Sequence, residues 1–126
     1  MKNELVLEEE SFVIRGAIYE VYKNLGAGFL ESIYQEALEI ELCNHGIPFE
    51  SQKDITVSYK GYPMRQQFRA DMVCYGQIIL ELKAVSKLLP EHEAQLHNYL
   101  KATGLHLGFL VNFSSPHGVE IKRIVR

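Results

Sequence analysis

Residues 68–83 read FRADMVCYGQIILELK, and the prediction of the fold starts from this segment. A Tyr75-Gly76 pair lies between two runs in which apolar residues alternate with others, a pattern typical of two antiparallel strands joined by a tight turn. Upstream, a similar alternation ends at a Lys60-Gly61 pair, which predicts a further turn and a further strand. The sequence therefore predicts an antiparallel meander of three strands, at about 55–59, 62–74 and 77–83.

Helical periodicity flanks this meander on both sides. Apolar residues recur at helical spacing after Ser11, a plausible N-cap, and again after the Gly26-Ala27-Gly28 break. A third helix is expected to begin at Pro90, which suits a first helical position, and to end at Gly104. That helix would carry a right-handed crossover, so that the strand after it runs parallel to the strand before it. The predicted helices span about 11–25, 30–44 and 90–103, and the predicted last strands span about 107–112 and 119–125.

This element order, α-α-β-β-β-α-β-β, predicts an α/β protein with one mixed sheet flanked by helices. The 126 residues are 47% hydrophobic and 23% charged, which is ordinary for a globular chain and excludes the disordered class. We expect a single domain over 1–126, with 1–25 as an N-terminal helical extension and 26–126 as the core. A chain of this size buries about two-thirds of its unfolded surface, enough for a core without staples.

Charge and cysteine content narrow the function classes. A net charge of −3 argues against coating of nucleic acid by bulk electrostatics, although it leaves room for a nucleic-acid enzyme whose site holds cations. The two cysteines, Cys43 and Cys74, are too few for a disulfide framework or a four-thiolate metal site, and we expect both to be reduced core residues. No secretory signal and no membrane-length apolar run is present, so the sequence predicts a cytoplasmic protein with no membrane contact.

Three charged side chains are predicted to converge on the meander. If the turn centres on Tyr75-Gly76, Asp71 and Glu81 occupy neighbouring positions on adjacent strands, and Glu81 and Lys83 share a face. Carboxylates are ligands that Mg²⁺ prefers, and a nearby ammonium group can orient or help to deprotonate an attacking water, so this set suits phosphodiester hydrolysis. The alternative is a solvated strand face with a cross-strand ion pair, which stabilises a sheet by a few tenths of a kcal/mol.

Two helical pairs add polar groups to this set. Glu31 and Tyr34 lie one turn apart at the start of the second helix, where Glu31 could instead interact with the helix dipole and Tyr34 could be a core residue. Gln95 and Tyr99 lie four residues apart on the helix that follows Lys83. Their structural alternative is a polar rim residue beside a core tyrosine.

The combination of Asp71, Glu81-x-Lys83 and Gln95-x-x-x-Tyr99 resembles the PD-(D/E)XK nuclease superfamily, in particular its RecB-like branch. The motif Gly28-x-x-Glu31-x-x-Tyr34 resembles the signature of the bacterial GxxExxY proteins placed in that superfamily. Ala70 stands where the superfamily name has proline. The resemblance covers about residues 25–126 and implies a restriction-endonuclease-like fold.

The resemblance also implies roles for individual residues. Asp71, Glu81 and the backbone carbonyl of Leu82 would bind Mg²⁺ or Mn²⁺, and Lys83 would act on the attacking water. Glu31 would complete or tune the metal shell, and Gln95 would position substrate or water. The implied substrate-binding residues are Gln95, Tyr99, Tyr34 and Lys87, and Tyr99 has the alternative role of packing its helix against the site.

The resulting hypothesis is a metal-dependent nuclease, a hydrolase acting on DNA in preference to RNA, either as a homodimer or within a larger DNA-processing complex. A catalytically inactive nuclease-fold module that binds nucleic acid or a protein partner is the main alternative, and a purely structural or dimerising protein is a third. The sequence argues against a zinc protease, because His92 and His97 are five residues apart and therefore about 140° apart around the helix. The two histidines of H-E-x-x-H are four residues apart and lie on one face.

Overall fold

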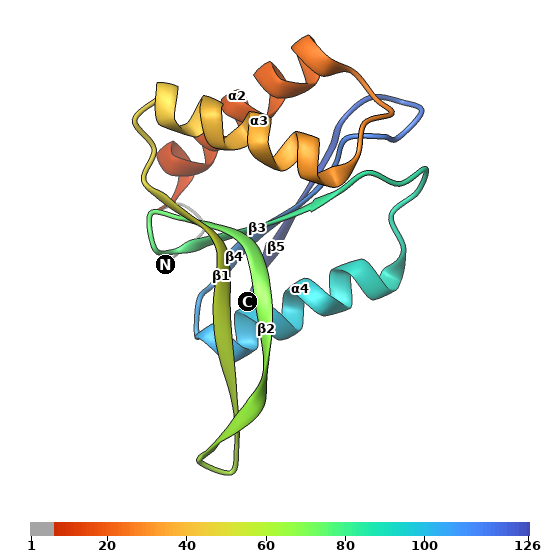
Figure 1. Ribbon diagram of the computed structural model, residues 1–126. Coiled ribbons are helices and arrows are strands. Elements are labelled where there is room, and N and C mark those ends of the chain that lie inside the picture. The colour runs from red at the N-terminus through yellow and green to blue at the C-terminus, as the bar shows by residue number, and fades with distance from the viewer. Residues whose placement is uncertain (1–6) are drawn as a thin grey trace.

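The computed structural model describes residues 7–126 as a five-stranded mixed sheet with helices on both faces (Figure 1). The spatial order of the strands follows the chain, β1-β2-β3-β4-β5. The predicted fold class and element order are confirmed. The elements are α2 (Glu8–Leu25), α3 (Glu31–Asn44), β1 (Phe49–Tyr59), β2 (Tyr62–Cys74), β3 (Ile78–Lys83), α4 (Pro90–Thr103), β4 (Leu107–Asn112) and β5 (Glu120–Val125).

The pairings within the meander and between β3 and β4 are those that the sequence predicted: β1, β2 and β3 form the antiparallel meander, and β4 runs parallel to β3 after the α4 crossover. The sequence made no prediction for the partner of β5, which returns antiparallel to β4. Tyr75 and Gly76 both have positive φ, 57° and 65°, as a type I′ hairpin turn requires. α4 begins at Pro90 and stops at Gly104, whose left-handed φ of 75° suits a residue without a Cβ.

The two faces of the sheet bury separate apolar clusters. α2 and α3 cover one face, where Ile78, Leu80 and Leu82 pack against both helices' apolar residues. α4 covers the other face, where Leu96 packs with Ile79. The face alternation predicted for β3 is therefore confirmed. Within residues 7–126, none of the helices is long and apolar enough to cross a membrane.

Two local predictions are wrong. Ser11 is not an N-cap, because α2 already begins at Glu8 and the Ser11 hydroxyl donates a hydrogen bond to the Leu7 carbonyl oxygen at 2.7 Å inside the first turn. Cys43 is exposed rather than part of the core, because it lies on the solvent side of α3. Cys74 is fully buried as predicted, and burial raises its pKa to about 12.

The β1–β2 hairpin extends beyond the helices that cover the sheet (Figure 1). β1 starts at Phe49, six residues before the alternation that predicted it. The alternation of Ile55, Val57 and Tyr59 suggested a buried face, but only Ile55 is buried, because the helices do not reach the other two.

Candidate active site

Asp71 and Glu81 lie opposite each other just beyond the last backbone pair of β2 and β3. The backbone ladder of these strands ends at the Met72–Leu80 pair, which places Asp71 and Glu81 at the next position, as predicted. There the Asp71 N–H donates to Glu81 Oε2 at 3.0 Å, and the Leu82 N–H donates to Asp71 Oδ2 at 2.8 Å. The main chain thus holds the two carboxylates beside each other where the strands diverge.

This pair concentrates negative charge in a poorly hydrated position. Glu81 is only 4% exposed, and burial, together with the negative charge of Asp71, raises its pKa to about 8. Burial also raises the pKa of Asp71, against the lowering effects of the Leu82 N–H and of the Lys83 charge. Burial and the mutual repulsion of the two carboxylates both oppose ionisation, so added positive charge beside the pair favours its ionised form.

A divalent cation fits this donor set. Carboxylate oxygens are hard ligands, and one or two carboxylates often suffice for Mg²⁺ when water and substrate phosphate supply the remaining ligands. Within residues 7–126, no group of three or more His, Cys, Asp and Glu side chains is close enough to form a cage made of side chains alone. The protein therefore offers two carboxylates to a cation, with the Leu82 backbone beside them.

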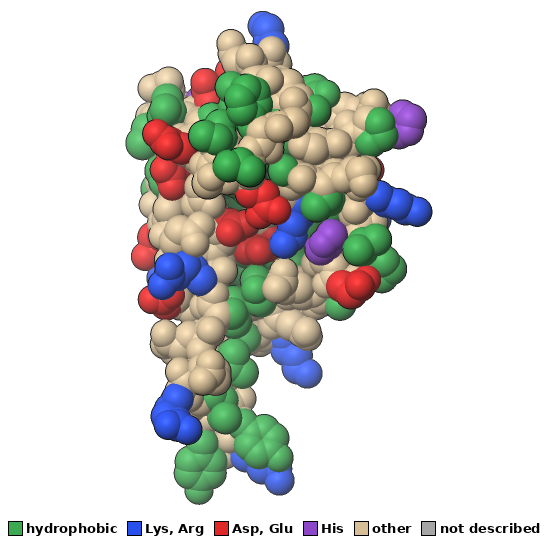
Figure 2. All heavy atoms as spheres, turned by 45° about the vertical axis from the view of Figure 1, so that its right-hand side comes forward, with side chains coloured by type: hydrophobic (Ala, Val, Ile, Leu, Met, Phe, Trp, Pro, Cys, Tyr) green, Lys and Arg blue, Asp and Glu red, His purple; other side chains and the backbone are tan. Residues whose placement is uncertain are grey.

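Lys83 and Glu31 lie near enough to act on both carboxylates. The positive charge of Lys83 lowers both pKa values and the negative charge of Glu31 raises both. Lys83 is half-buried at the end of β3, and Glu31 is exposed at the first position of α3. Figure 2 shows acidic side chains gathered beside a basic side chain and a histidine in the middle of one face.

Tyr99 lies near enough for the carboxylate charges to act on its hydroxyl. Its ring stacks on Phe68 of β2, with centroids 3.8 Å apart and planes at 6°. Burial raises the pKa of Tyr99, as do the charges of Glu81 and Asp71, whereas a hydrogen bond from Gln95 lowers it. Gln95 itself is exposed, so α4 presents an amide and a phenol at the rim of the site.

Tyr34 has a structural position instead of a substrate-facing one. Its side chain is fully buried and stacks on Phe113 with centroids 4.4 Å apart. Its hydroxyl donates to the Gly26 carbonyl oxygen and accepts a hydrogen bond from the Phe29 N–H at 3.2 Å. Tyr34 therefore has no free surface for a substrate, and it fixes the loop that leads into Glu31.

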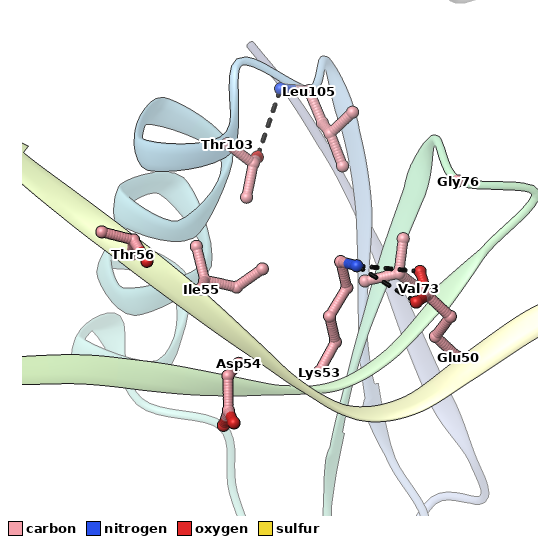
Figure 3. Close-up of a pocket in the computed structure, with 9 residues that line it drawn as sticks. All are labelled: Glu50, Lys53, Asp54, Ile55, Thr56, Val73, Gly76, Thr103 and Leu105. Carbon is pink, nitrogen blue, oxygen red and sulfur yellow. Dashed lines mark hydrogen bonds and ion pairs between the residues drawn. The ribbon is translucent and has the colours of Figure 1, made fainter.

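Lys87 is exposed on the loop between β3 and α4, where it lines a shallow hollow with Lys122 and Arg123 of β5. The pKa shifts of Asp71 and Glu81 are attributed to other groups than Lys87. A different hollow, of about 380 Å³, lies between β1 and the C-terminal end of α4 and contains the Lys53–Glu50 ion pair at 3.0 Å (Figure 3). It includes none of the predicted site residues.

Sequence reasoning missed Gln52 and Gln35. Gln52 lies opposite Asp71, between the registered pairs of Ser51 and Lys53, and its φ of 51° is rare for a residue other than glycine. Its amide donates to Gln35 Oε1 at 2.8 Å, and Gln35 Nε2 donates to the Asp71 carbonyl oxygen at 3.0 Å.

A side-chain hydrogen bond from Gln52 also lowers the Asp71 pKa. The two glutamines thus hold Asp71 by its carboxylate and its main chain. Neither the glutamine in α3 nor the glutamine in β1 has a sequence pattern around it that predicts these hydrogen bonds.

Comparisons with known proteins agree with this geometry. A family model described as the PD-(D/E)XK nuclease superfamily matches residues 8–124. A search of curated proteins found no match. Among solved structures, the fold is similar to that titled "Crystal structure of SSO0001", with a TM-score of 0.57 and 18% identity over 93% of this chain and 77% of that chain. The chain belongs to the PD-(D/E)XK nuclease superfamily.

Proposed function

We propose that this protein is a metal-dependent nuclease that hydrolyses phosphodiester bonds, with DNA as its substrate. Members of the superfamily are generally nucleases that use divalent metal ions. The observation that carries the proposal is the hydrogen-bonded pair of the buried Glu81 and the partly buried Asp71, with raised pKa values and with Lys83 near enough to act on both. Buried like charges are costly in a folded protein and are typical of sites that bind cations or perform catalysis.

Asp71, Glu81 and the Leu82 carbonyl would hold Mg²⁺ or Mn²⁺, and Glu31 would tune the charge of the shell. When bound, the ion would offset the charge that develops on the phosphate. Lys83 would orient the attacking water through its ammonium group. Gln95 would hold the water or a phosphate oxygen, and Tyr99 would contact the nucleic-acid backbone.

The first motif of the chain supports a finer placement. We propose that the protein belongs to the RecB-like branch and to the GxxExxY group, because Gly28 and Tyr34 belong to the loop and helix that place Glu31 beside the carboxylates. We further propose that residues 1–126 act as one nuclease unit, with 1–25 extending the core at 26–126. A homodimer remains a prediction, which sedimentation equilibrium tests.

The test is cleavage of end-labelled single- and double-stranded DNA in Mg²⁺, in Mn²⁺ and in chelator. We compare the wild type, Lys83→Ala and, as a matched control, Lys23→Ala, which removes an exposed lysine of α2. The proposal requires metal-dependent cutting by the wild type and by the control, and a loss of at least tenfold in Lys83→Ala. Equal cutting by Lys83→Ala would contradict the site.

A second candidate is an inactive nuclease-fold module that binds nucleic acid or a protein partner. It is favoured by the ligand set, because within the described residues 7–126 no group of three or more His, Cys, Asp and Glu side chains could hold a metal ion. Binding of DNA by folded wild type without cutting in either metal would favour this candidate.

A further inference from the structure

The end of the β1–β2 hairpin, residues 57–67, is a solvated two-stranded ribbon. Every side chain of β2 from 62 to 67 is exposed, as are those of β1 from 56 to 59. The ribbon closes in a type I′ turn, in which Lys60 and Gly61 have φ of 49° and 83°. Because an isolated two-stranded ribbon is marginally stable, an apolar surface on it needs a reason other than the core.

One face of this ribbon carries an exposed apolar stripe. Tyr59 and Tyr62 are partners in the register, so they point to the same face. Val57 and Met64 lie two residues further from the turn on their own strands, where the register shifts, and both are exposed. Tyr59 is 61% exposed and Tyr62 is 73% exposed. Aromatic rings this accessible can each stack with a planar partner.

The stripe continues toward the candidate active site. Along β1 the same face passes from Tyr59 to the buried Ile55, whose partner Phe68 stacks on Tyr99. The charge of Glu81 in turn acts on Tyr99. Figure 2 shows hydrophobic side chains following the hairpin from its tip to the body, on the same face as the gathered acidic side chains.

The charge of the ribbon is opposite to that of the rest of the chain. Residues 57–67 contain Lys60 and Arg65 and no acid, which gives +2, whereas the whole chain carries −3, so the remainder carries −5. Lys60 Nζ lies 5.5 Å from the centre of the Tyr59 ring. Within residues 7–126, neither Lys60 nor Arg65 takes part in an ion pair. The ribbon therefore offers cations to an anionic partner.

We infer that this ribbon grips a nucleic-acid strand whose cleaved phosphate lies at Asp71 and Glu81. Lys60 and Arg65 contact phosphates, and Tyr59 and Tyr62 stack against bases, the combination that proteins use on single strands. The inference rests on the proposed function for its choice of substrate. A second copy of this chain that paired ribbon against ribbon would bring four cations together, whereas a nucleic acid supplies a phosphate for each cation and a base for each ring, which favours nucleic acid as the occupant.

The geometry sets a length for the strand. Seven residues of β1 separate Tyr59, the partner of Tyr62, from Gln52, which lies opposite Asp71, whereas β2 carries extra residues at a register shift. An extended strand rises about 3.3 Å per residue, so the ribbon reaches about 23 Å from the carboxylates. Stacked nucleotides are spaced about 3.4 Å apart along a strand, so this span corresponds to about seven nucleotides. Stacked oligonucleotides shorter than about seven nucleotides cannot contact both places.

The experiment measures binding of fluorescent single-stranded DNA of 30 and of 5 nucleotides by anisotropy in chelator, where cutting is prevented. The ring variant is Tyr59→Ala with Tyr62→Ala. The charge variant is Lys60→Asn with Arg65→Gln, because Asn tolerates the positive φ of the turn. The matched controls are Tyr19→Ala, which removes a ring 53% exposed on α2, and Lys23→Gln.

We expect the ring variant to bind the 30-nucleotide strand at least tenfold more weakly than wild type, since each stacked ring contributes about tenfold. The charge variant should reduce the slope of log affinity against log salt by about 1.4, at about 0.7 per phosphate contact. The 5-nucleotide strand, which cannot contact the ribbon and the carboxylates at once, should bind the wild type more weakly than the 30-nucleotide strand does. Binding of the long strand at wild-type strength by both variants would overturn the inference.

A second readout separates this inference from the proposed function. Hydrolysis of bis(p-nitrophenyl) phosphate in Mn²⁺ requires the carboxylates, and this substrate is too small to contact the ribbon at the same time. Hydrolysis by wild type with unchanged DNA binding in the ring variant contradicts the ribbon and keeps the nuclease. Ribbon-dependent DNA binding without any hydrolysis contradicts the nuclease and keeps the ribbon. A change in sedimentation with unchanged DNA binding would assign the ribbon to a second copy, contrary to the inference.

Discussion

Replacement of Glu81 by glutamine should stabilise the metal-free protein. Burial and the Asp71 charge raise the Glu81 pKa from an ordinary 4.5 to about 8. At pH 7, about 2.5 pH units above the ordinary value, the unfolded chain releases the Glu81 proton and the folded protein keeps it, which destabilises the folded state by about 3 kcal/mol at about 1.4 kcal/mol per pH unit. Glu81→Gln removes this destabilisation, and its amide oxygen can still accept a hydrogen bond from the Asp71 N–H.

The sign of the pH dependence follows from the same shift. Between about pH 4.5 and pH 8 the folded wild type keeps a proton on Glu81 that the unfolded chain releases, so the stability of the metal-free wild type falls as pH rises through this interval. The stability of Glu81→Gln should fall less. At pH 5 the two proteins should differ little, and at pH 7 the variant should be more stable by about 1–3 kcal/mol.

The assay is urea unfolding followed by circular dichroism, at pH 5, 7 and 8.5, in chelator and in Mn²⁺. The matched control is Glu36→Gln, an exposed glutamate of α3. In Mn²⁺ at a hundred times its dissociation constant the wild type should gain about 2.7 kcal/mol, and the variant should gain much less. A variant less stable than wild type in chelator at pH 7 would refute the reasoning about buried like charges.

Three other predictions concern single contacts. Gln52→Gly should keep the fold, because glycine accepts the φ of 51°, whereas Gln52→Ile should lower the free energy of unfolding by about 1–2 kcal/mol, measured by urea unfolding. Tyr34→Phe removes two hydrogen bonds of a buried hydroxyl and should cost about 1–3 kcal/mol of stability without weakening DNA binding; weakened binding at unchanged stability would contradict its structural role. Cys43 should react with Ellman's reagent in the folded protein, and Cys74 should react only on unfolding, so a count of two fast thiols would contradict the burial of Cys74.

The fold was predictable where local signals and periodicity agree. The Tyr75-Gly76 turn and the alternation after it specified the β2–β3 hairpin, and with it the neighbouring positions of Asp71 and Glu81. Pro90 and Gly104 marked the limits of α4 because each has a specific backbone requirement.

What could not be predicted depends on tertiary contacts. No side-chain cap marks the start of α2 at Glu8, so the sequence wrongly predicted a helix start at Ser11, the next residue of a cap-forming type. Gln52 and Gln35 come from different elements and meet only in the folded chain. The exposure of Tyr59 depends on where the helices end over the sheet, which strand alternation does not encode.

We propose above that Asp71 and Glu81 form a site for a divalent cation. Calorimetric titration of Mn²⁺ into the wild type, Asp71→Asn and the control Asp54→Asn tests it most directly, since Asp54 is an exposed acid paired with Arg69 at 2.9 Å. We expect saturable Mn²⁺ binding by the wild type and by the control, and no saturable Mn²⁺ binding by folded Asp71→Asn. Binding of equal affinity and stoichiometry in Asp71→Asn would contradict it.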